Sequence, residues 1–219
     1  MTTRRRYDDA CAAAHALDLV GERWALLVVR ELLFGPKRFT DLRTGLPGAS
    51  PNVLSQRLRE LDAAGVLRRR RIPPPAAAWV YELTPWGHGL EPVVTALGRW
   101  GAQAPGALGE GPISVDSMML ALRSLYDPER AAGLAADVVV SLGEDGFRAT
   151  VTPAGLRLAR EVVDRPDVVI HTDTVTLHGV ICGRRTKEEV LAAGDLVVAG
   201  DEAVALRFLT LFPFPEPVA

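Results

Sequence analysis

The sequence lacks long apolar runs and has very few cysteines. It contains no stretch of about 18 uninterrupted apolar residues, the length that a membrane-spanning helix needs. Near the amino end, Asp8, Asp9 and Asp18 interrupt what would be the apolar core of a secretory signal peptide. The cysteines, Cys11 and Cys182, lie far apart and form no CxxC or Cys/His spacing. We therefore expect a cytoplasmic protein that contacts no membrane and holds no metal and no cofactor.

Catalytic signatures are missing too. The four histidines have no carboxylate or nucleophile at a spacing typical of a catalytic site. Neither a phosphate-binding loop nor a nucleophile elbow occurs. The sequence therefore predicts a protein that is not an enzyme.

Charge is distributed unevenly along the chain of 219 residues, although the net charge is only −2. Residues 1–101 hold 15 lysines and arginines against 10 acidic residues, a net charge of +5, whereas residues 102–219 hold 10 against 17, a net charge of −7. The segment 102–112 is rich in glycine and proline, as interdomain connections are. We predict a basic domain at 1–101, a linker at 102–112 and an acidic domain at 113–219, and a basic domain favours an anionic partner.

The basic half has the pattern of four successive helices. Apolar spacing predicts a helix at 9–20, which a left-handed Gly21 would close, and a buried central helix at 22–34. A short helix capped by Thr40 follows. Ser50 and the proline after it then predict the start of a helix that runs to residue 64.

The fourth helix is amphipathic. Its apolar stripe comprises Leu54, Leu58 and Leu61. Its opposite face carries Asn52, Ser55, Gln56 and Arg59. Asparagine, glutamine and arginine can bond base edges, and serine and arginine can also bond phosphate, so this face fits a helix in the major groove of DNA. The alternative is an ordinary solvated helix surface.

Two strand-like runs at 66–72 and 79–83 flank a proline-rich turn and predict a β-hairpin. The first run carries four consecutive arginines, 68–71, so at least one face of the hairpin is cationic. A basic hairpin after a helix-turn-helix favours a wing that contacts phosphate. The alternative is an edge strand whose arginines only deter aggregation.

The basic half resembles the HxlR-type winged helix-turn-helix transcriptional regulators of bacteria. The resemblance rests on Cys11, on LDLVGERW at 17–24, LLFGPKRFTDL at 32–42, LSQRLREL at 54–61 and YELTPWG at 81–87. It implies a homodimer that binds a double-stranded palindromic operator, with the recognition helix at 50–64 and the wing at 66–84. The residues expected to contact DNA are Arg38, Thr40, Ser50, Asn52, Ser55, Gln56, Arg59, Arg69 and Arg71.

Dimer contacts are implied for the first helix and for a helix at 84–101, whose apolar face comprises Leu90, Val93, Val94, Leu97 and Trp100. Packing within one chain is the alternative for that face. In some members of the resembled family the cysteine at the position of Cys11 senses oxidants or electrophiles. Those members commonly have proline after it, whereas this chain has Ala12, and inert packing is the other interpretation of Cys11.

The acidic half has an α+β pattern: a helix at 113–126, β-like runs at 134–142, 146–152, 155–163 and 167–171, and then helices around a short strand at 196–198. It resembles the sterol-carrier-protein-2 (SCP2-like) fold through 167–174, 183–196 and 200–212. That resemblance implies a small, mainly antiparallel sheet and a tunnel for apolar ligands. The candidate pocket residues are Met118, Leu177, Val180, Ile181, Leu206, Phe208, Leu209 and Phe212. A filled core would give the same sequence pattern.

Together these features predict a mainly α winged helix-turn-helix domain followed by an α+β SCP2-like domain. The expected function is a homodimeric DNA-binding transcriptional regulator, modulated by an apolar or aromatic small molecule in the second domain. One alternative keeps the DNA-binding dimer and makes the second domain a protein docking or oligomerisation module without a ligand. A lipid-transfer protein or an enzyme is the remaining alternative.

Overall fold

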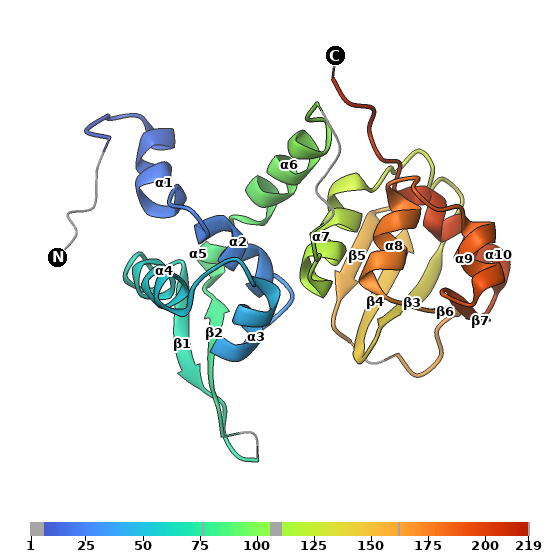
Figure 1. Ribbon diagram of the computed structural model, residues 1–219, viewed down its shortest axis with the longest axis horizontal. Coiled ribbons are helices and arrows are strands. Elements are labelled where there is room, and N and C mark those ends of the chain that lie inside the picture. Colours follow the sequence, from blue (N-terminus) through green and yellow to red (C-terminus); the bar gives the residue numbers. More distant parts are fainter. Residues whose placement is uncertain (1–6, 76, 106–110, 162, 219) are drawn as a thin grey trace. The chain divides into compact units, whose positions relative to one another are not determined.

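A computed structural model describes residues 7–75, 77–105, 111–161 and 163–218. The chain divides into two compact units, Met1–Val94 and Thr95–Ala219, which are described separately (Figure 1). The division lies inside helix α6 (Glu91–Ala102) and not in the expected linker at 102–112, part of which lies outside the described residues. The boundaries of the functional domains stay a prediction.

The first unit is helical with one hairpin. Its helices are α1 (Ala12–Val20), α2 (Ala25–Leu32), α3 (Phe39–Gly45), α4 (Pro51–Ala63) and α5 (Pro85–His88), followed by the start of α6. Its strands are β1 (Leu67–Arg71) and β2 (Trp79–Leu83), paired antiparallel. Figure 1 shows this hairpin projecting beyond α3 and α4. The winged helix-turn-helix arrangement expected from the sequence is therefore present.

The start of α4 follows from its first residues. The Ser50 hydroxyl accepts a hydrogen bond from the Val53 amide at 3.4 Å, and Pro51 occupies the first helical position. Leu54, Leu58 and Leu61 are almost completely buried against the rest of the unit. This burial fixes the orientation of α4, so its polar residues face outward.

Three local expectations in this unit are wrong. Gly21 has a right-handed φ of −77°, and the left-handed residue is Trp24, directly before α2, which therefore starts later than expected. The cap of α3 is Arg38, whose amide donates to the Asp41 carboxylate at 2.9 Å, and not Thr40. A carboxylate three residues after the cap competes well for that amide.

The third correction concerns the expected helix at 84–101, which is two helices, α5 and α6. The Thr84 hydroxyl caps α5 by accepting from the Gly87 amide at 3.0 Å and also donates to the Gly65 carbonyl. Gly87 lies so close to the Val66 carbonyl that a Cβ would come within 1.9 Å of its oxygen. Pro92 has no amide hydrogen, so a second helix begins around it instead of continuing the first.

The second unit is an α+β fold. Its helices are α7 (Val115–Leu125), α8 (Thr174–Ile181), α9 (Lys187–Ala193), α10 (Glu202–Phe208) and the 3-10 turn η1 (Leu209–Leu211). Its strands are β3 (Ala136–Leu142), β4 (Asp145–Thr152), β5 (Gly155–Ala159), β6 (Val168–Thr172) and β7 (Val197–Gly200). They form a five-stranded sheet in the order β5-β4-β3-β6-β7. Only β3 and β6 pair in parallel, so the α+β class and a mixed, mainly antiparallel sheet are confirmed for the described residues.

The two faces of this sheet differ. Along β3, burial alternates between fully buried residues such as Val138 and Val140 and partly exposed residues such as Val139. Helix α10 packs against β3 and β6, and α7 packs against β5. The helices therefore cover one face, and the other face is more open.

The residues expected to line a ligand tunnel lie on the helix-covered side. Met118, Leu177, Ile181, Phe208, Leu209 and Phe212 are buried, and Val180 and Leu206 are partly exposed. Phe208 packs edge-on against Phe212 with ring centroids 5.0 Å apart. These side chains form part of the core between helices and sheet, and their role in ligand binding stays a prediction.

Candidate functional site

The outward face of α4 holds the polar residues that the sequence assigns to base contacts. Asn52 and Arg59 are exposed, and Ser55 and Gln56 are partly exposed. Within the described residues Arg59 makes no hydrogen bond or ion pair, whereas the Gln56 amide donates to the Glu60 carboxylate at 3.0 Å. Three of these side chains can therefore approach a groove directly, and Gln56 must first leave Glu60.

One arginine of α4 has a structural role that the sequence did not indicate. Arg57 is buried, lies 2.5 Å from the Glu60 carboxylate and 3.8 Å from that of Glu22, and so ties α4 to the segment before α2. Its spacing from Leu54 and Leu61 places it beside the buried stripe, which is the only sequence signal that could have identified it. Arg57 is thus an anchor, and Arg59 is the arginine that α4 offers to a partner.

Arg38 and Thr40 lie at the exposed amino end of α3. The Thr40 hydroxyl donates to the Asp41 carboxylate at 3.2 Å, and the Arg38 side chain makes no ion pair with a described residue. Ser50 is exposed but its hydroxyl is used as the cap of α4. Of these three residues, Arg38 therefore has the most freedom to reach an anion.

A buried carboxylate holds α2 and the loop before α3 together. Glu31 is fully buried, and its two oxygens accept from Arg30 at 2.9 Å and from Lys37 at 2.8 Å. The backbone of Lys37 in turn pairs with Tyr81 of β2. Glu31 therefore links the helices to the base of the hairpin. The only sequence signal of this role is that Glu31 and Arg30 are the charged residues of a mainly apolar helix.

The hairpin separates its four arginines into two pairs, because alternate residues of a strand point to opposite faces. On one face, Glu82 accepts from Arg68 Nε at 2.7 Å and from Arg70 Nε at 2.6 Å. Burial alone would raise the pKa of the Glu82 carboxyl, but the hydrogen bonds and positive charges of these two arginines together outweigh burial and lower that pKa. Glu82 is therefore ionised at neutral pH.

The other face carries Arg69 and Arg71, both exposed and without an acidic partner among the described residues. The Arg69 guanidinium stacks on the exposed ring of Trp79, 4.5 Å from its centroid. Trp79 is the cross-strand neighbour of Arg71 in the β1–β2 register. This face therefore presents two cations available to an external anion, one of them held by an aromatic ring.

Helix α6 exposes an apolar stripe. Val93, Leu97 and Trp100 are 49%, 47% and 72% exposed, while Val94 points inward and Leu90 is partly exposed. Next to its start lies an apolar groove of about 250 Å³, lined by residues of α1 and α5, the turn before α6 and the residue before β1: Ala16, Leu19, Val20, Val66, Trp86, Gly89 and Leu90. Of the five residues of the expected dimer face, Val93, Leu97 and Trp100 are therefore the three that are exposed.

The two thiols have opposite environments. Cys11 is exposed at the position that caps α1, and hydrogen bonding from the backbone of Ala14 and Ala13 lowers its thiol pKa. Cys182 is partly buried, which raises its pKa, and its sulfur lies 3.3 Å from the His178 ring. No group of three or more histidine, cysteine, aspartate or glutamate side chains in the described ranges could hold a metal ion.

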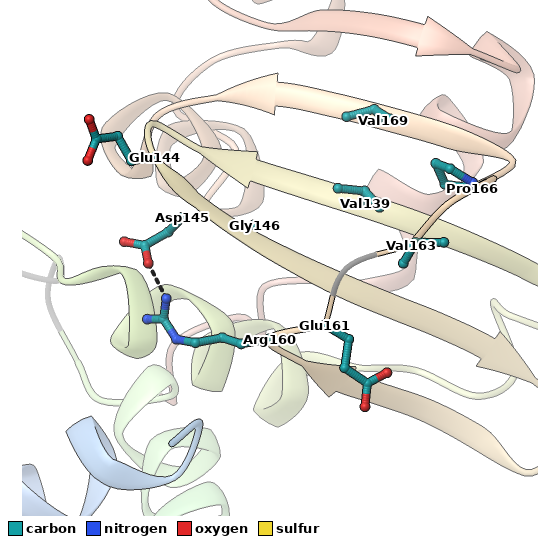
Figure 2. Close-up of a pocket in the computed structure, with 9 residues that line it drawn as sticks. All are labelled: Val139, Glu144, Asp145, Gly146, Arg160, Glu161, Val163, Pro166 and Val169. Atoms are coloured by element: carbon teal, nitrogen blue, oxygen red, sulfur yellow. Dashed lines mark hydrogen bonds and ion pairs between the residues drawn. The ribbon is translucent and has the colours of Figure 1, made fainter. Parts of the chain in front are cut away.

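The open face of the second unit's sheet carries a groove of about 540 Å³ (Figure 2). Val139 and Val169 lie side by side on β3 and β6 and form its floor. Val163 and Pro166 add apolar walls, and Arg160 turns toward Asp145 at the rim. None of the eight residues expected to bind a ligand lines this groove.

Comparisons with known proteins concern the first unit and the part of the chain just after it. The HxlR-like helix-turn-helix family matches residues 19–107. The uncharacterized HTH-type transcriptional regulator YvaP of Bacillus subtilis (strain 168) is 38% identical over 88 residues, which are 40% of this chain and 82% of YvaP. The uncharacterized HTH-type transcriptional regulator sll1512 of Synechocystis is 36% identical over 92 residues, 42% of this chain and 68% of the relative. These relatives are transcriptional regulators and not enzymes.

A solved structure of the reduced form of the transcriptional regulator YodB from B. subtilis is also similar, with 31% identity. It covers 45% of this chain and all of the YodB chain, with a TM-score of 0.40.

In the part of the chain that the structure describes, no helix is long and apolar enough to cross a membrane.

Proposed function

The chain belongs to the HxlR-like helix-turn-helix family of DNA-binding transcriptional regulators, and from that premise we propose that it binds a palindromic operator as a homodimer. The observation that carries the proposal is the pairing of two exposed features in one unit. Helix α4 directs Asn52, Ser55 and Arg59 outward, and the wing adds Arg69 and Arg71 without acidic partners among the described residues. Base edges and phosphates are the partners that such a combination fits.

DNA binding can be tested with a labelled duplex of about 30 base pairs, long enough for two half-sites one helical turn apart. Selection from random duplexes with the full chain should enrich a palindromic sequence. Arg59→Ala should weaken binding and relax the preference at one position of each half-site, by about 1–3 kcal/mol if Arg59 contacts a base. Arg165→Ala is the matched control, because Arg165 is an exposed arginine of the second unit with no described partner. Equal binding by both variants would contradict the role of Arg59.

The homodimer is proposed from the exposed stripe on α6. Three large apolar side chains on one helix face, Val93, Leu97 and Trp100, are unfavourable in water and suit a second copy of the chain. The groove beside Leu90 extends this apolar surface toward α1. A symmetric pair of recognition helices would then read the two halves of a palindrome.

The second unit is proposed to bind an apolar or aromatic small molecule that changes operator affinity. The groove on the open sheet face supports this proposal, because its volume of about 540 Å³ falls within the usual range for small-molecule sites and its floor is apolar. A ligand can act on DNA binding only if it favours one arrangement of the two recognition helices over another. Helix α6 is continuous across the division between the units, which gives such coupling a covalent route.

Gly146 allows a direct test of the groove. It lies on β4 at the groove, and a Cβ at this position would meet no atom within 4 Å, so Gly146→Phe should fill the space without disturbing the strand. Titration with N-phenyl-1-naphthylamine, an uncharged aromatic fluorophore, should show binding to the wild-type chain and not to Gly146→Phe. Val175→Phe, an exposed position on α8, is the control. Equal fluorophore binding by all three proteins would show that this groove is not the binding site. If the chain binds no apolar compound, the result would favour a second unit that serves as a protein docking module.

A further inference from the structure

The wing presents fewer free cations than its sequence suggests. Of the four successive arginines in β1, Arg68 and Arg70 share one carboxylate, that of Glu82 on β2. Arg68 approaches Glu82 Oε1 with both Nε and Nη2 at 2.7 Å, and Arg70 Nε approaches Oε2 at 2.6 Å. Both carboxylate oxygens are therefore occupied, and each arginine uses at least one N–H group within the hairpin.

We propose that Glu82 sets how strongly the wing binds DNA of any sequence, because it limits the number of wing arginines that can bind DNA phosphates. The proposal rests on the proposed DNA-binding function. Of the run 68–71, Arg69 and Arg71 are then available to DNA, whereas Arg68 and Arg70 are held by Glu82. Glu82 contributes in two ways: it occupies donor groups of Arg68 and Arg70, and its negative charge repels a phosphate that approaches the same face.

The low exposure of Glu82 indicates that its ion pairs with Arg68 and Arg70 are stable contacts. The Glu82 side chain is only 14% exposed, whereas those of Arg68 and Arg70 are 63% and 41% exposed. The carboxylate therefore lies beneath two more exposed guanidinium groups and is shielded from solvent. Charge-assisted hydrogen bonds of this length are among the stronger ones in proteins. A phosphate that binds Arg68 or Arg70 through the remaining N–H groups also meets the negative charge of Glu82, and one that takes an Nε donor leaves Glu82 with one partner fewer.

A limit on phosphate contacts lowers the affinity for DNA of every sequence. Phosphate contacts supply nearly all of the affinity for non-specific DNA, and base contacts supply the preference for one sequence. Each additional phosphate contact therefore strengthens binding to every duplex. By withholding two contacts, Glu82 weakens binding to operator and non-operator duplexes alike and leaves the preference for one sequence to the base contacts.

Glu82→Gln tests the proposal with the full-length chain and a random-sequence duplex of about 30 base pairs, measured by fluorescence anisotropy over a range of salt concentrations. If Arg68 and Arg70 then reach phosphate, the slope of log affinity against log salt should become steeper by about 2, since each contact adds about 0.9. Affinity should consequently fall about tenfold more between about 50 and 200 mM salt than it does for the wild-type chain. Asp62→Asn removes the same charge from an exposed position near the end of α4 and serves as the matched control.

A second set of variants separates this role from a structural one. Arg68→Gln with Arg70→Gln should leave the wild-type slope nearly unchanged and should cancel the steepening in the Glu82→Gln background. Thermal unfolding of each variant monitors the hairpin's integrity. If Glu82→Gln and Asp62→Asn have the same slope, or if Arg68 and Arg70 already contribute to the wild-type slope, the proposal is wrong. Absence of duplex binding by the wild-type chain would instead contradict the proposed function.

Discussion

Both units pair some of their arginines with carboxylates, but the first unit also leaves exposed arginines without an acidic partner on the face proposed to bind DNA. In Met1–Val94, Arg38, Arg59 and Arg71 are exposed and have no acidic partner within the described ranges. In Thr95–Ala219, arginines that form ion pairs with aspartate or glutamate include Arg130, Arg148, Arg157, Arg160 and Arg185. The first unit therefore offers positive charge to an external anion, and the second uses most of its positive charge internally.

Net charge alone does not reveal this difference. The first half is basic by five charges, and four consecutive arginines contribute most of that excess, yet Glu82 binds two of them. The second half contains ten basic residues, a number that would suffice for a nucleic-acid surface if they were free. The comparison shows that partner choice depends on which cations lack a neighbouring carboxylate, a property of strand pairing and helix packing.

The largest effect is expected on α6, which belongs to both units. Leu97→Asp would place a charge in the exposed apolar stripe, and burying that charge in a dimer interface would cost several kcal/mol. We expect a monomer in analytical ultracentrifugation and a loss of operator affinity of about 100-fold or more, because one half-site would be lost. Arg99→Gln, on another face of the same helix, should remain dimeric. A dimeric Leu97→Asp protein would show that the stripe packs elsewhere.

The next effect concerns the free cations themselves. Arg69→Gln together with Arg71→Gln should reduce the salt slope of duplex binding by about 2 and weaken binding to all sequences alike. The same double change at Arg157, which is exposed, and Arg185, which is partly exposed, should leave the slope unchanged, because both are ion-paired. If both double variants reduce the salt slope equally, the arginines of the two units do not differ in their availability to DNA.

The difference between the units also explains what the sequence could predict. Helix α4 and the hairpin were predicted with nearly correct bounds, because Ser50-Pro51 and the β-branched and arginine-rich runs are local signals. The capping of α3 by Arg38 and the break before α6 were missed. They depend on competition between neighbouring groups: the Asp41 carboxylate in one case and the contact of Gly87 with Val66 in the other.

The candidate sites follow the same rule. The outward residues of α4 could be predicted because a helix has a fixed period, whereas the retention of Arg68 and Arg70 by Glu82 depends on the register of two strands. The ligand site was predicted on the helix-covered side of the sheet, from apolar residues whose pattern is the same for a packed core. The groove at Val139 and Val169 could not be predicted, because each valine lies inside a run of apolar residues and the sequence does not show which of them face the open side of the sheet.

A smaller effect is a loss of stability in acid, which we expect in the sheet of the second unit. Hydrogen bonds from Arg148 and Thr150 lower the pKa of the Asp137 carboxyl. A carboxyl whose pKa is lowered by folding stabilises the protein above its unfolded value of about 3.9, and this stabilisation is lost as the pH falls through the folded value. The melting temperature of the sheet, measured by circular dichroism, should therefore decline below about pH 4. The decline should be less steep in Asp137→Asn. Thr172→Val, on a different strand, is the control, and identical profiles for Asp137→Asn and the wild-type chain would contradict this role.

The smallest expected effect is a difference in reactivity between the two thiols, Cys11 in the first unit and Cys182 in the second. The backbone hydrogen bonds at the start of α1 lower the pKa of Cys11, and Cys11 is exposed, whereas burial raises the pKa of Cys182. Because the thiolate is the reactive form, iodoacetamide at neutral pH should modify Cys11 several-fold faster than Cys182, as measured by peptide mass spectrometry. Cys11→Ser should leave only the slow reaction. Faster modification of Cys182 would mean that its contact with His178 produces a thiolate despite burial. If Cys11 is the faster site, treatment of the wild-type chain and Cys11→Ser with a quinone or diamide, followed by duplex binding, determines whether its reactivity regulates the protein.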